Sequence, residues 1–453
     1  MQHSETIKIA HIGGGSQNWA PTVIRDIIFK RGMERLRLDI RLLDIDAPRA
    51  KAIETLFDVK LKEWGIDRVR IRAAAEAREA LSNADFVLIT ISTGRLEAMR
   101  HDLAIPEKYG VYHTVGDTSG PGGWSRSLRN IPVFKTYAEL IKKVAPKAYV
   151  LNYTNPMGTL TKVLADELGP NKVVGLCHGL FEALEVLQRI FGLQSEKEVI
   201  TRFAGLNHFF WVLDMKINGR DGHKMLRDKM KGRKFHELVG EAYEDPMGFS
   251  SRYLLAGELL ENYGHLPYIG DRHTCEFFSC YITSPELMER FGLKRTSIED
   301  RERGYRAAAE RIKLWTEGKE ADFALNTEPS RETAADIMHA IVFNEGFTDV
   351  VNTVNAGQVP NLPLGAVVET MGLVDSSGFR ALAAGPLPES IKAVVAPHAE
   401  VQIRTVQAGL SGDKEAALMA LVADPVCARL TVSDIKKMGQ ELIAANRRFM
   451  HKG

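Results

Sequence analysis

The chain has 453 residues, of which 45% are hydrophobic and 26% are charged, and its formal net charge is +1. These values are ordinary for a globular protein of two or three domains, and the basic excess that accompanies nucleic-acid binding is missing. The N-terminus leads into a strand-like run without a signal segment, no stretch has the apolar length of a membrane helix, and the four cysteines contain no CxxC pair. We therefore expect a cytoplasmic protein without nucleic-acid or membrane partners.

Short apolar runs alternate with amphipathic stretches through the first half of the chain. Strands are predicted within residues 7–15, 36–46, 84–92, 148–156 and 172–179. Such an alternation favours a parallel sheet flanked by helices. Ligands of these folds bind outside the carboxyl ends of the strands, so the polar and glycine-rich residues that follow each strand are the candidates for a functional site.

Three glycines follow the first predicted strand, in IGGGSQNW, and a helix is predicted after them. Glycines let backbone amides approach a pyrophosphate, so Gly13, Gly15 and Ser16 are predicted to hold a dinucleotide, although the loop departs from GxGxxG near Trp19. Asp44 ends the second strand in LLDID, where its carboxylate can accept hydrogen bonds from both ribose hydroxyls. Its charge disfavours the 2′-phosphate of NADP, and NAD is therefore the predicted cofactor.

A cysteine and a histidine stand where the strand at 172–179 gives way to a helix, in GLCHG. Taken alone, Cys177 is more typical of a packing residue, and the same holds for His208 in AGLNH. Together with the glycine loop, a thiolate and an imidazole suit a soft or borderline divalent ion and leave positions open for substrate oxygens. We therefore predict one metal site that is formed by Cys177 and His208.

The second half of the chain has a different pattern. Residues 199–219 are predicted to form a hairpin of two strands, and mainly helical segments follow, among them 297–318. This pattern favours an α+β domain packed against the first domain. The predicted fold class is α/β, with an NAD-binding Rossmann domain over residues 1–195 and a domain for substrate, metal binding and oligomerisation over residues 196–453.

The ordered set of motifs resembles glycoside hydrolase family 4, whose members are NAD- and metal-dependent glycosidases. The resemblance runs almost end to end. It implies a Rossmann domain joined to a second domain like that of lactate and malate dehydrogenases, Mn²⁺ as the metal, and a homodimer or homotetramer. The matching segments are IGGGS, LLDID, STGRLEAMRHDLAIPEKYG, GDTSGPGG, NYTNPM, GLCHG, GLNHFFW, GDRHTCEFF, VNAGQVPNLPLGAVVE and LSGDKEAALMALVADP.

The resemblance also implies roles for single residues. It places the metal on Cys177 and His208, Asn155 of the TNP motif beside the substrate and the metal, and sugar contacts at Arg95 and Asp117. The implied chemistry removes a hydride from sugar C3 to NAD⁺, removes the acidified C2 proton with a base, and breaks the C1–O bond by elimination. Water then adds and the hydride returns, while the metal stabilises the enediolate as a Lewis acid.

The proton-transfer residues are left open by the sequence. The stretch HLPYIGDRHTCEFF offers Asp271, Tyr268 and His265 as the base; Asp271 matches the GD of some family members, whereas others use an upstream tyrosine. His178, directly after the metal cysteine, is predicted to protonate the leaving group. Its alternative role is to hydrogen-bond a neighbour of the metal site.

The residues after the metal cysteine, C-H-G-L, resemble the C-H-G-x group of the family, which acts on α-linked uronic acids. The C6 carboxylate of such a sugar needs a cation, which Arg272 and His273 are predicted to supply; a structural salt bridge is the alternative. We therefore predict an α-galacturonidase first and an α-glucuronidase second. Neutral α-glucosides or α-galactosides and 6-phospho-glycosides are alternative substrates, and a metal-free NAD-dependent hydroxy-acid dehydrogenase is the alternative of another class.

Overall fold

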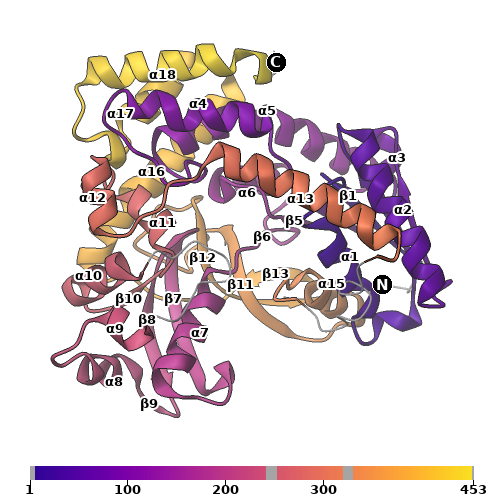
Figure 1. Ribbon diagram of the computed structural model, residues 1–453, viewed down its shortest axis with the longest axis horizontal. Helices are drawn as coiled ribbons and strands as arrows, with labels where there is room; N and C mark the ends of the chain where they lie inside the picture. Colours follow the sequence, from indigo (N-terminus) through magenta and orange to yellow (C-terminus); the bar gives the residue numbers. More distant parts are fainter. Residues whose placement is uncertain (1–5, 241–251, 320–329, 451–453) are drawn as a thin grey trace.

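The computed structural model describes residues 6–240, 252–319 and 330–450 (Figure 1). Its strands are β1 (Thr6–Ile12), β2 (Arg37–Leu43), β3 (Val69–Ala73), β4 (Phe86–Ile89), β5 (Tyr149–Asn152), β6 (Val173–Gly175), β7 (Val199–Leu206), β8 (Phe209–Ile217), β9 (Arg220–Asp221), β10 (Leu266–Pro267), β11 (Phe347–Val354), β12 (Val367–Asp375) and β13 (Gly378–Ala381). They form one sheet in the order β10-β8-β7-β12-β11-β6-β5-β4-β1-β2-β3, with β9 paired to β8 and β13 paired to β12.

The helices of the described chain cover both faces of this sheet and extend beyond its ends. They are α1 (Ala20–Phe29), α2 (Ala47–Glu63), α3 (Ala77–Leu81), α4 (Arg95–Glu107), α5 (Gly120–Val144), α6 (Met157–Leu168), α7 (Gly179–Phe191), α8 (Gly222–Lys229), α9 (Phe235–Val239), α10 (Leu254–Tyr263), α11 (Asp271–Thr274) with the 3₁₀ turn η3 (Cys275–Phe277), α12 (Pro285–Arg290), α13 (Ile298–Thr316), α15 (Ala334–Phe343), α16 (Glu389–Ser411), α17 (Lys414–Val422) and α18 (Val432–Asn446).

The first six strands form a parallel sheet in the order β3-β2-β1-β4-β5-β6. This is the strand order of dinucleotide-binding folds, and the predicted Rossmann domain is confirmed. The five strands expected in this half are present. The sequence analysis missed β3, whose pattern Val-Arg-Ile-Arg-Ala alternates at the edge of the sheet and lacks the long apolar run of a buried parallel strand.

The sheet continues into the second half of the chain without a break. Strand β11 pairs antiparallel with β6 through Asn352 and Gly175, and β12, β7 and β8 follow, also antiparallel. The predicted hairpin over residues 199–219 is confirmed as β7 and β8, which a two-residue turn joins. The α/β fold class with an α+β second half is thus as predicted. The boundary at residue 195 stays a prediction, because helices of the second half also pack on the first.

The two faces of the parallel sheet carry separate apolar cores. Successive residues of a strand point to opposite faces, so Ile9 belongs to the core beneath α1, α2 and α15, and Ala10 belongs to the core beneath α5 and α6. Helix α15 comes from the second half of the chain, and α16 likewise packs on α5 and α6. Each fully buried leucine, isoleucine or phenylalanine contributes about 1.5–3 kcal/mol, which fixes the two halves of the chain against each other.

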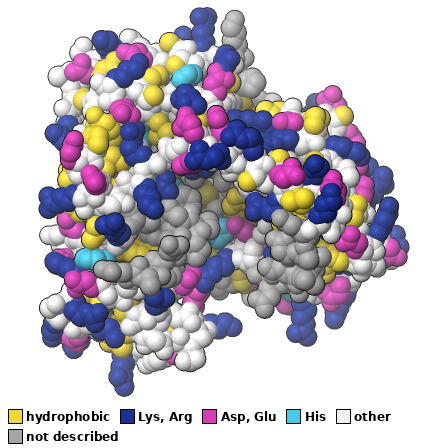
Figure 2. Space-filling view, in the orientation of Figure 1, with side chains coloured by type: hydrophobic (Ala, Val, Ile, Leu, Met, Phe, Trp, Pro, Cys, Tyr) yellow, Lys and Arg dark blue, Asp and Glu magenta, His cyan; other side chains and the backbone are white. Residues whose placement is uncertain are grey.

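Helix α13 crosses from one half of the molecule to the other (Figure 1). Just before its start, Thr296 N–H donates to the carbonyl of Thr114 at 2.6 Å, and further along the helix the Tyr305 ring lies 5.7 Å from the Arg49 guanidinium of α2. Figure 2 shows Lys and Arg side chains gathered over the first half of this helix. In the part of the chain that the structure describes, no helix has both the length and the apolar character needed to cross a membrane.

Candidate active site

A cavity of about 680 Å³ lies at the carboxyl ends of the parallel strands and is lined by both halves of the chain. Eight of the residues singled out from the sequence line it: Ser16, Asp117, Asn155, Cys177, His178, His208, Tyr268 and His273. Seven others do not line it: Gly13, Gly15, Asp44, Arg95, His265, Asp271 and Arg272. The structure therefore brings most of the predicted catalytic and metal-binding residues together, although they come from distant parts of the sequence.

The glycine loop fits closely between β1 and the ends of its neighbouring strands. A Cβ atom on Gly13, whose φ is +89°, would lie 2.3 Å from the carbonyl oxygen of Thr90, and one on Gly15 would lie 2.8 Å from a carboxylate oxygen of Asp44. Only glycine allows this approach of backbone to backbone. The Gly15 N–H donates to Asp44 Oδ2 at 3.0 Å, and Asp46 N–H donates to the second oxygen, Oδ1, at 2.9 Å.

Asp44 is thus held rigidly at the end of β2 while each of its oxygens keeps a free lone pair. That geometry suits a carboxylate that accepts two ribose hydroxyls, and the bare glycine backbone beside Ser16 suits a pyrophosphate. The residues present therefore fit a dinucleotide such as NAD.

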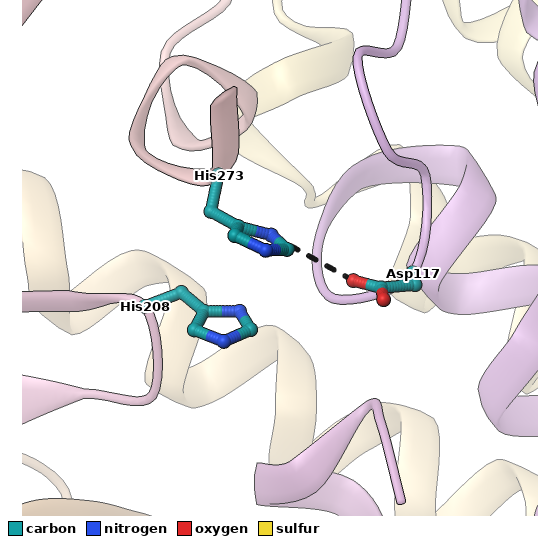
Figure 3. Close-up of side chains that lie close together, drawn as sticks. All are labelled: Asp117, His208 and His273. Atoms are coloured by element: carbon teal, nitrogen blue, oxygen red, sulfur yellow. Dashed lines mark ion pairs between the residues drawn. The ribbon is translucent and has the colours of Figure 1, made fainter. Parts of the chain in front are cut away.

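Asp117, His208 and His273 form a compact group in the cavity (Figure 3). Their potential ligand atoms lie within 4.8 Å of one another, and the two imidazoles stack with their centroids 3.9 Å apart. His273 Nδ1 lies 3.8 Å from Asp117 Oδ1. A carboxylate and two imidazoles are common ligands of divalent transition metals, so this group can hold a metal ion.

His208 stands in the turn between β7 and β8 with a φ of +62°. A left-handed conformation costs a non-glycine residue about 1–3 kcal/mol, and such strain is concentrated at functional sites. Thr118 Oγ1 lies 3.0 Å from His208 Nδ1 and donates its single hydrogen to Asp117 Oδ1 at 2.7 Å. The hydrogen-bond pattern therefore assigns the proton of the imidazole to Nδ1, which leaves the Nε2 lone pair for a metal ion.

The charge states of this group suit a cation. Burial would raise the pKa of Asp117, but electrostatic interactions with His273, Arg126 and His208 and the hydrogen bond from Thr118 lower it below its usual range. Burial lowers the pKa of His208, so its imidazole is neutral. The side-chain oxygen of Asn155 is buried in the same cavity and has no hydrogen-bond partner among the described residues. An anionic carboxylate, a neutral imidazole and an orphaned amide oxygen together fit a divalent metal ion.

Cys177 lines the cavity two residues after β6, but it is not part of the compact group of three. Burial, followed by the neighbouring Glu369 carboxyl, raises the pKa of its thiol well above the usual value. A hydrogen bond from the Asn207 side chain opposes this shift. A divalent cation acts in the same direction as that hydrogen bond and more strongly, so Cys177 fits the role of a thiolate ligand that forms with the metal.

The sequence analysis missed a buried glutamate, Glu369, that lies close to the two predicted metal ligands, Cys177 and His208. Glu369 of β12 is fully buried, and its Oε2 accepts hydrogen bonds from Asn207 and Asn352, each at 2.9 Å. Burial raises its pKa to about 7. Asn207 directly precedes His208, and its side chain interacts with Cys177. By holding Asn207, Glu369 therefore helps to position both predicted metal ligands. The signal in the sequence was a charged residue inside the apolar strand VVETMGLVD.

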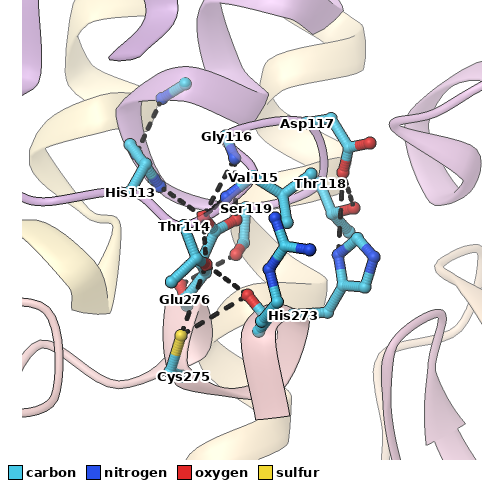
Figure 4. A network of polar contacts seen from close by, with 12 residues as sticks. His113, Thr114, Val115, Gly116, Asp117, Thr118, Ser119, His273, Cys275 and Glu276 are labelled. Carbon is cyan, nitrogen blue, oxygen red and sulfur yellow. Dashed lines mark hydrogen bonds and ion pairs between the residues drawn. The ribbon is translucent and has the colours of Figure 1, made fainter. Parts of the chain in front are cut away.

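A second missed glutamate ties the loop of Asp117 to the helix of His273 (Figure 4). Glu276 Oε1 accepts hydrogen bonds from Val115 N at 2.6 Å, Gly116 N at 2.9 Å and Thr114 Oγ1 at 2.8 Å. Burial would raise its pKa, but the adjacent His113 and the Val115 amide keep the pKa low, so Glu276 is a carboxylate. Asp117 and His273 therefore owe their mutual position to a single buried charge.

Of the three candidate bases, His265 does not line the cavity, and its Nδ1 lies 3.1 Å from the carbonyl oxygen of Tyr263. The other two lie in different surroundings. The carboxylate of Asp271 accepts hydrogen bonds from Leu255 N at 3.3 Å and Ala256 N at 3.0 Å at the start of α10, and it does not face the cavity. Burial raises its pKa to about 7. Tyr268 does line the cavity, with its ring 5.6 Å from that of His208. Of the two, only Tyr268 lies beside the candidate metal group.

Two predicted sugar-binding arginines lie outside the cavity. Arg272 Nε donates to the carbonyl of Lys294 at 2.8 Å, and its Nη2 donates to Thr296 Oγ1 at 3.0 Å, so the guanidinium holds the start of α13. Arg95 pairs with Asp46 at 3.3 Å beside the glycine loop. Neither position brings a cation to the cavity, because both guanidinium groups are engaged elsewhere.

His178 is the N-cap residue of α7, which ends where Gly192 takes the left-handed conformation. Its Nε2 lies 2.8 Å from Glu332 Oε2, and both residues line the cavity. Burial raises the pKa of Glu332, against the opposing effect of His178. The pair can share a proton within the cavity.

The chain is similar over its whole length to known proteins. A family model described as family 4 glycosyl hydrolase matches residues 8–193, and one for the C-terminal domain of that family matches residues 203–427. An alpha-galacturonidase of Thermoanaerobacter italicus is 31% identical over 98% of each chain, and one of Bacillus subtilis is 32% identical over 97% of each chain. A solved 6-phospho-alpha-glucosidase from gut microorganisms, in complex with NAD and Mn²⁺, has the same fold, with a TM-score of 0.81, 20% identity and 99% of each chain covered.

Proposed function

The chain belongs to glycosyl hydrolase family 4, and we propose that it cleaves α-linked galacturonides with NAD and a divalent metal ion, Mn²⁺ first, as cofactors. The observation that carries this proposal is a single cavity that joins a dinucleotide cradle to a cluster of metal-binding side chains. Full-length similarity to alpha-galacturonidases of two bacteria supports the choice of sugar.

In this proposal Gly13, Gly15, Ser16 and Asp44 hold the dinucleotide. Cys177 and His208 hold the metal ion, with Asp117, His273 and Asn155 beside it. When bound, NAD supplies an acceptor for a sugar hydride, and the metal ion supplies a Lewis acid for sugar oxygens. The neutral His208 and the ionised Asp117 need no proton release before a cation binds, whereas the Cys177 thiol does.

Two residues of the cavity are assigned the proton transfers. We assign removal of the sugar C2 proton to Tyr268 acting as the phenolate, which becomes the hydroxyl in this step, since the Asp271 carboxylate is engaged at the start of α10. His178 delivers a proton to the oxygen of the leaving group, and Glu332 orients the imidazole through Nε2. In this step the protonated imidazole keeps Nε2–H against Glu332, and the Nδ1–H bond breaks as the proton passes to the leaving-group oxygen.

The compartment and the assembly belong to the same proposal. A thiol that must form a metal thiolate favours a reducing compartment, and we propose the cytoplasm. We propose a homodimer or homotetramer as the assembly, which light scattering on the purified protein would measure directly.

The proposed activity is tested by hydrolysis of p-nitrophenyl α-D-galacturonide and α-D-glucuronide, with the neutral α-galactoside and α-glucoside as controls. Under reducing conditions we expect release of nitrophenol from the galacturonide only when both NAD⁺ and Mn²⁺ are present. NADH absorbance should not accumulate, because the hydride returns to the sugar. Accumulation of NADH in proportion to turnover would indicate a dehydrogenase instead, and cleavage of the neutral glycosides alone would overturn the choice of sugar.

A further inference from the structure

Three arginines line the cavity, and they differ in their partners. Arg126 donates from Nε to the carbonyl of Asn155 at 2.9 Å, and its charge stabilises the carboxylate of Asp117. Arg331 pairs with Glu185 at 3.2 Å and with Glu196. Arg301, by contrast, makes no side-chain hydrogen bond or ion pair with any residue that the structure describes.

Arg301 is half-buried in the first turns of α13, a helix tied at its start to the loop that carries Asp117. Its positive charge acts on both His273 and Arg272, which places it on the metal side of the cavity. Tyr305, one turn further along α13, lies against Arg49 on the dinucleotide side. The helix therefore spans the cavity, with Arg301 at the end where the sugar would lie.

A half-buried guanidinium without a counter-charge is a costly arrangement, which an anionic ligand relieves. The C5 atom of a pyranose, which bears the carboxylate of a uronic acid, lies across the ring from C2. A sugar anchored through its C2 and C3 oxygens at the metal group therefore presents its carboxylate away from that group, to another wall of the cavity. A guanidinium can bind a carboxylate through two parallel hydrogen bonds.

We propose that Arg301 binds the C6 carboxylate of the substrate and thereby selects uronides over neutral glycosides. This assignment rests on the proposed function. It replaces Arg272 and His273, the two residues predicted from the sequence: the guanidinium of Arg272 supports the start of α13, and His273 lies in the compact group with Asp117 and His208. The same cation could instead meet the pyrophosphate of the dinucleotide, and the experiment is designed to separate these two anions.

The test compares Arg301→Gln with the wild-type enzyme, both loaded with NAD⁺ and Mn²⁺. We expect kcat/KM for p-nitrophenyl α-D-galacturonide to fall roughly 100-fold, as for the loss of a charge-assisted bidentate pair. The dissociation constant of D-galacturonate, measured by calorimetry, should rise by a similar factor. The KM of NAD⁺ and the affinity for D-galactose should change less than about twofold, because neither contacts Arg301.

Arg303→Gln is the matched control, since Arg303 lies on the same helix, is exposed and pairs only with Asp300 among the described residues. It removes the same charge from α13 and should leave all four measurements unchanged. The proposal is overturned if Arg301→Gln weakens galacturonate and galactose equally, or if it weakens NAD⁺ instead.

Failure of the proposed function would be seen in the wild-type enzyme itself. A wild-type enzyme that neither cleaves the galacturonide nor binds galacturonate overturns both proposals. If the wild-type protein binds galacturonate through Arg301 without cleaving the galacturonide, the proposed activity is wrong, whereas the assignment of Arg301 stands.

Discussion

The dinucleotide side and the metal side of the cavity are built in different ways. On the dinucleotide side, Gly13 to Ser16 are consecutive in the sequence, and Asp44 follows the neighbouring strand. On the metal side, Asp117, Cys177, His208 and His273 come from four separate segments. The dinucleotide side therefore depends on the conformation of one loop, whereas the metal side depends on buried groups that hold distant segments together.

This difference indicates which substitutions should disturb each side of the cavity. The glycine loop is fixed by close contacts with the backbone of Thr90 and by the hydrogen bond from the Gly15 N–H to Asp44, the one residue outside the loop that also belongs to the dinucleotide side. The metal side depends on Glu276 and Glu369, two fully buried carboxyl groups that touch neither the cavity nor a ligand. Changes on the two sides should therefore separate cleanly into effects on dinucleotide binding and effects on metal binding.

The largest effect is expected from loss of a metal ligand. His208→Ala and Cys177→Ser should each lower kcat by on the order of 1,000-fold or more, because the Lewis acid is lost with the metal. Mn²⁺ affinity, measured by calorimetry, should fall with the activity, while NAD⁺ affinity stays within about twofold. His236→Asn, on α9 outside the cavity, is the control. Full activity of Cys177→Ser with bound metal would remove Cys177 from the site and leave the compact group of three.

A smaller loss is expected when the contact of Glu276 with the loop that carries Asp117 is weakened. Glu276→Gln keeps the shape of the side chain but presents an amide where two backbone N–H groups need an acceptor. We expect Mn²⁺ affinity and kcat to fall about 10- to 100-fold, as for other groups that orient metal ligands. Exposed Glu289→Gln is the matched control. An unchanged Mn²⁺ affinity in a folded Glu276→Gln enzyme would show that the Glu276 carboxylate does not position the metal site.

A substitution on the dinucleotide side should weaken NAD⁺ binding and leave Mn²⁺ binding unchanged. Asp44→Asn should raise the KM of NAD⁺ about 10-fold, since two charge-assisted hydrogen bonds to ribose become neutral ones. It should also narrow the preference for NAD⁺ over NADP⁺, because the repulsion of the 2′-phosphate is removed. Initial-rate kinetics with both dinucleotides measure this, with Asp58→Asn as the control. A fall in Mn²⁺ affinity would contradict the independence of the two sides.

The smallest effect concerns stability, and it involves Asp349, which does not line the cavity. Burial raises the pKa of Asp349 to about 6. The folded state therefore binds a proton that the unfolded state has already released, and stability declines as pH rises through about 6. Between pH 5 and pH 7 the loss due to Asp349 should be about 1 kcal/mol, and Asp349→Asn should reduce the pH dependence of urea unfolding by that amount, while the contributions of Asp271 and Glu369 remain. An identical pH dependence in both proteins would show that Asp349 is not the responsible group.

The same contrast explains what could be predicted from the sequence. Features that depend on neighbours along the chain were predictable, such as the strands, the hairpin and the places of Gly13, Asp44 and Cys177 just after strand ends. The orientation of Asp271 and Arg272 could not be predicted, because it depends on α10 and on Lys294, which are distant in sequence. Glu276 and Arg301 were missed for a related reason, since only the folded chain reveals that the first is buried and that the second lacks a partner among the described residues, whereas Glu369 left a signal as a charged residue inside an apolar strand.

The central claim is that one cavity combines a hydride acceptor with a base that removes the sugar C2 proton. Hydrolysis of p-nitrophenyl α-D-galacturonide in D₂O, followed by NMR of the product, tests it most directly. We predict deuterium at C2 of the released galacturonate, and no turnover or incorporation with Tyr268→Phe. Turnover that leaves hydrogen at C2 would contradict the claim, because direct hydrolysis by two carboxylates does not break that bond.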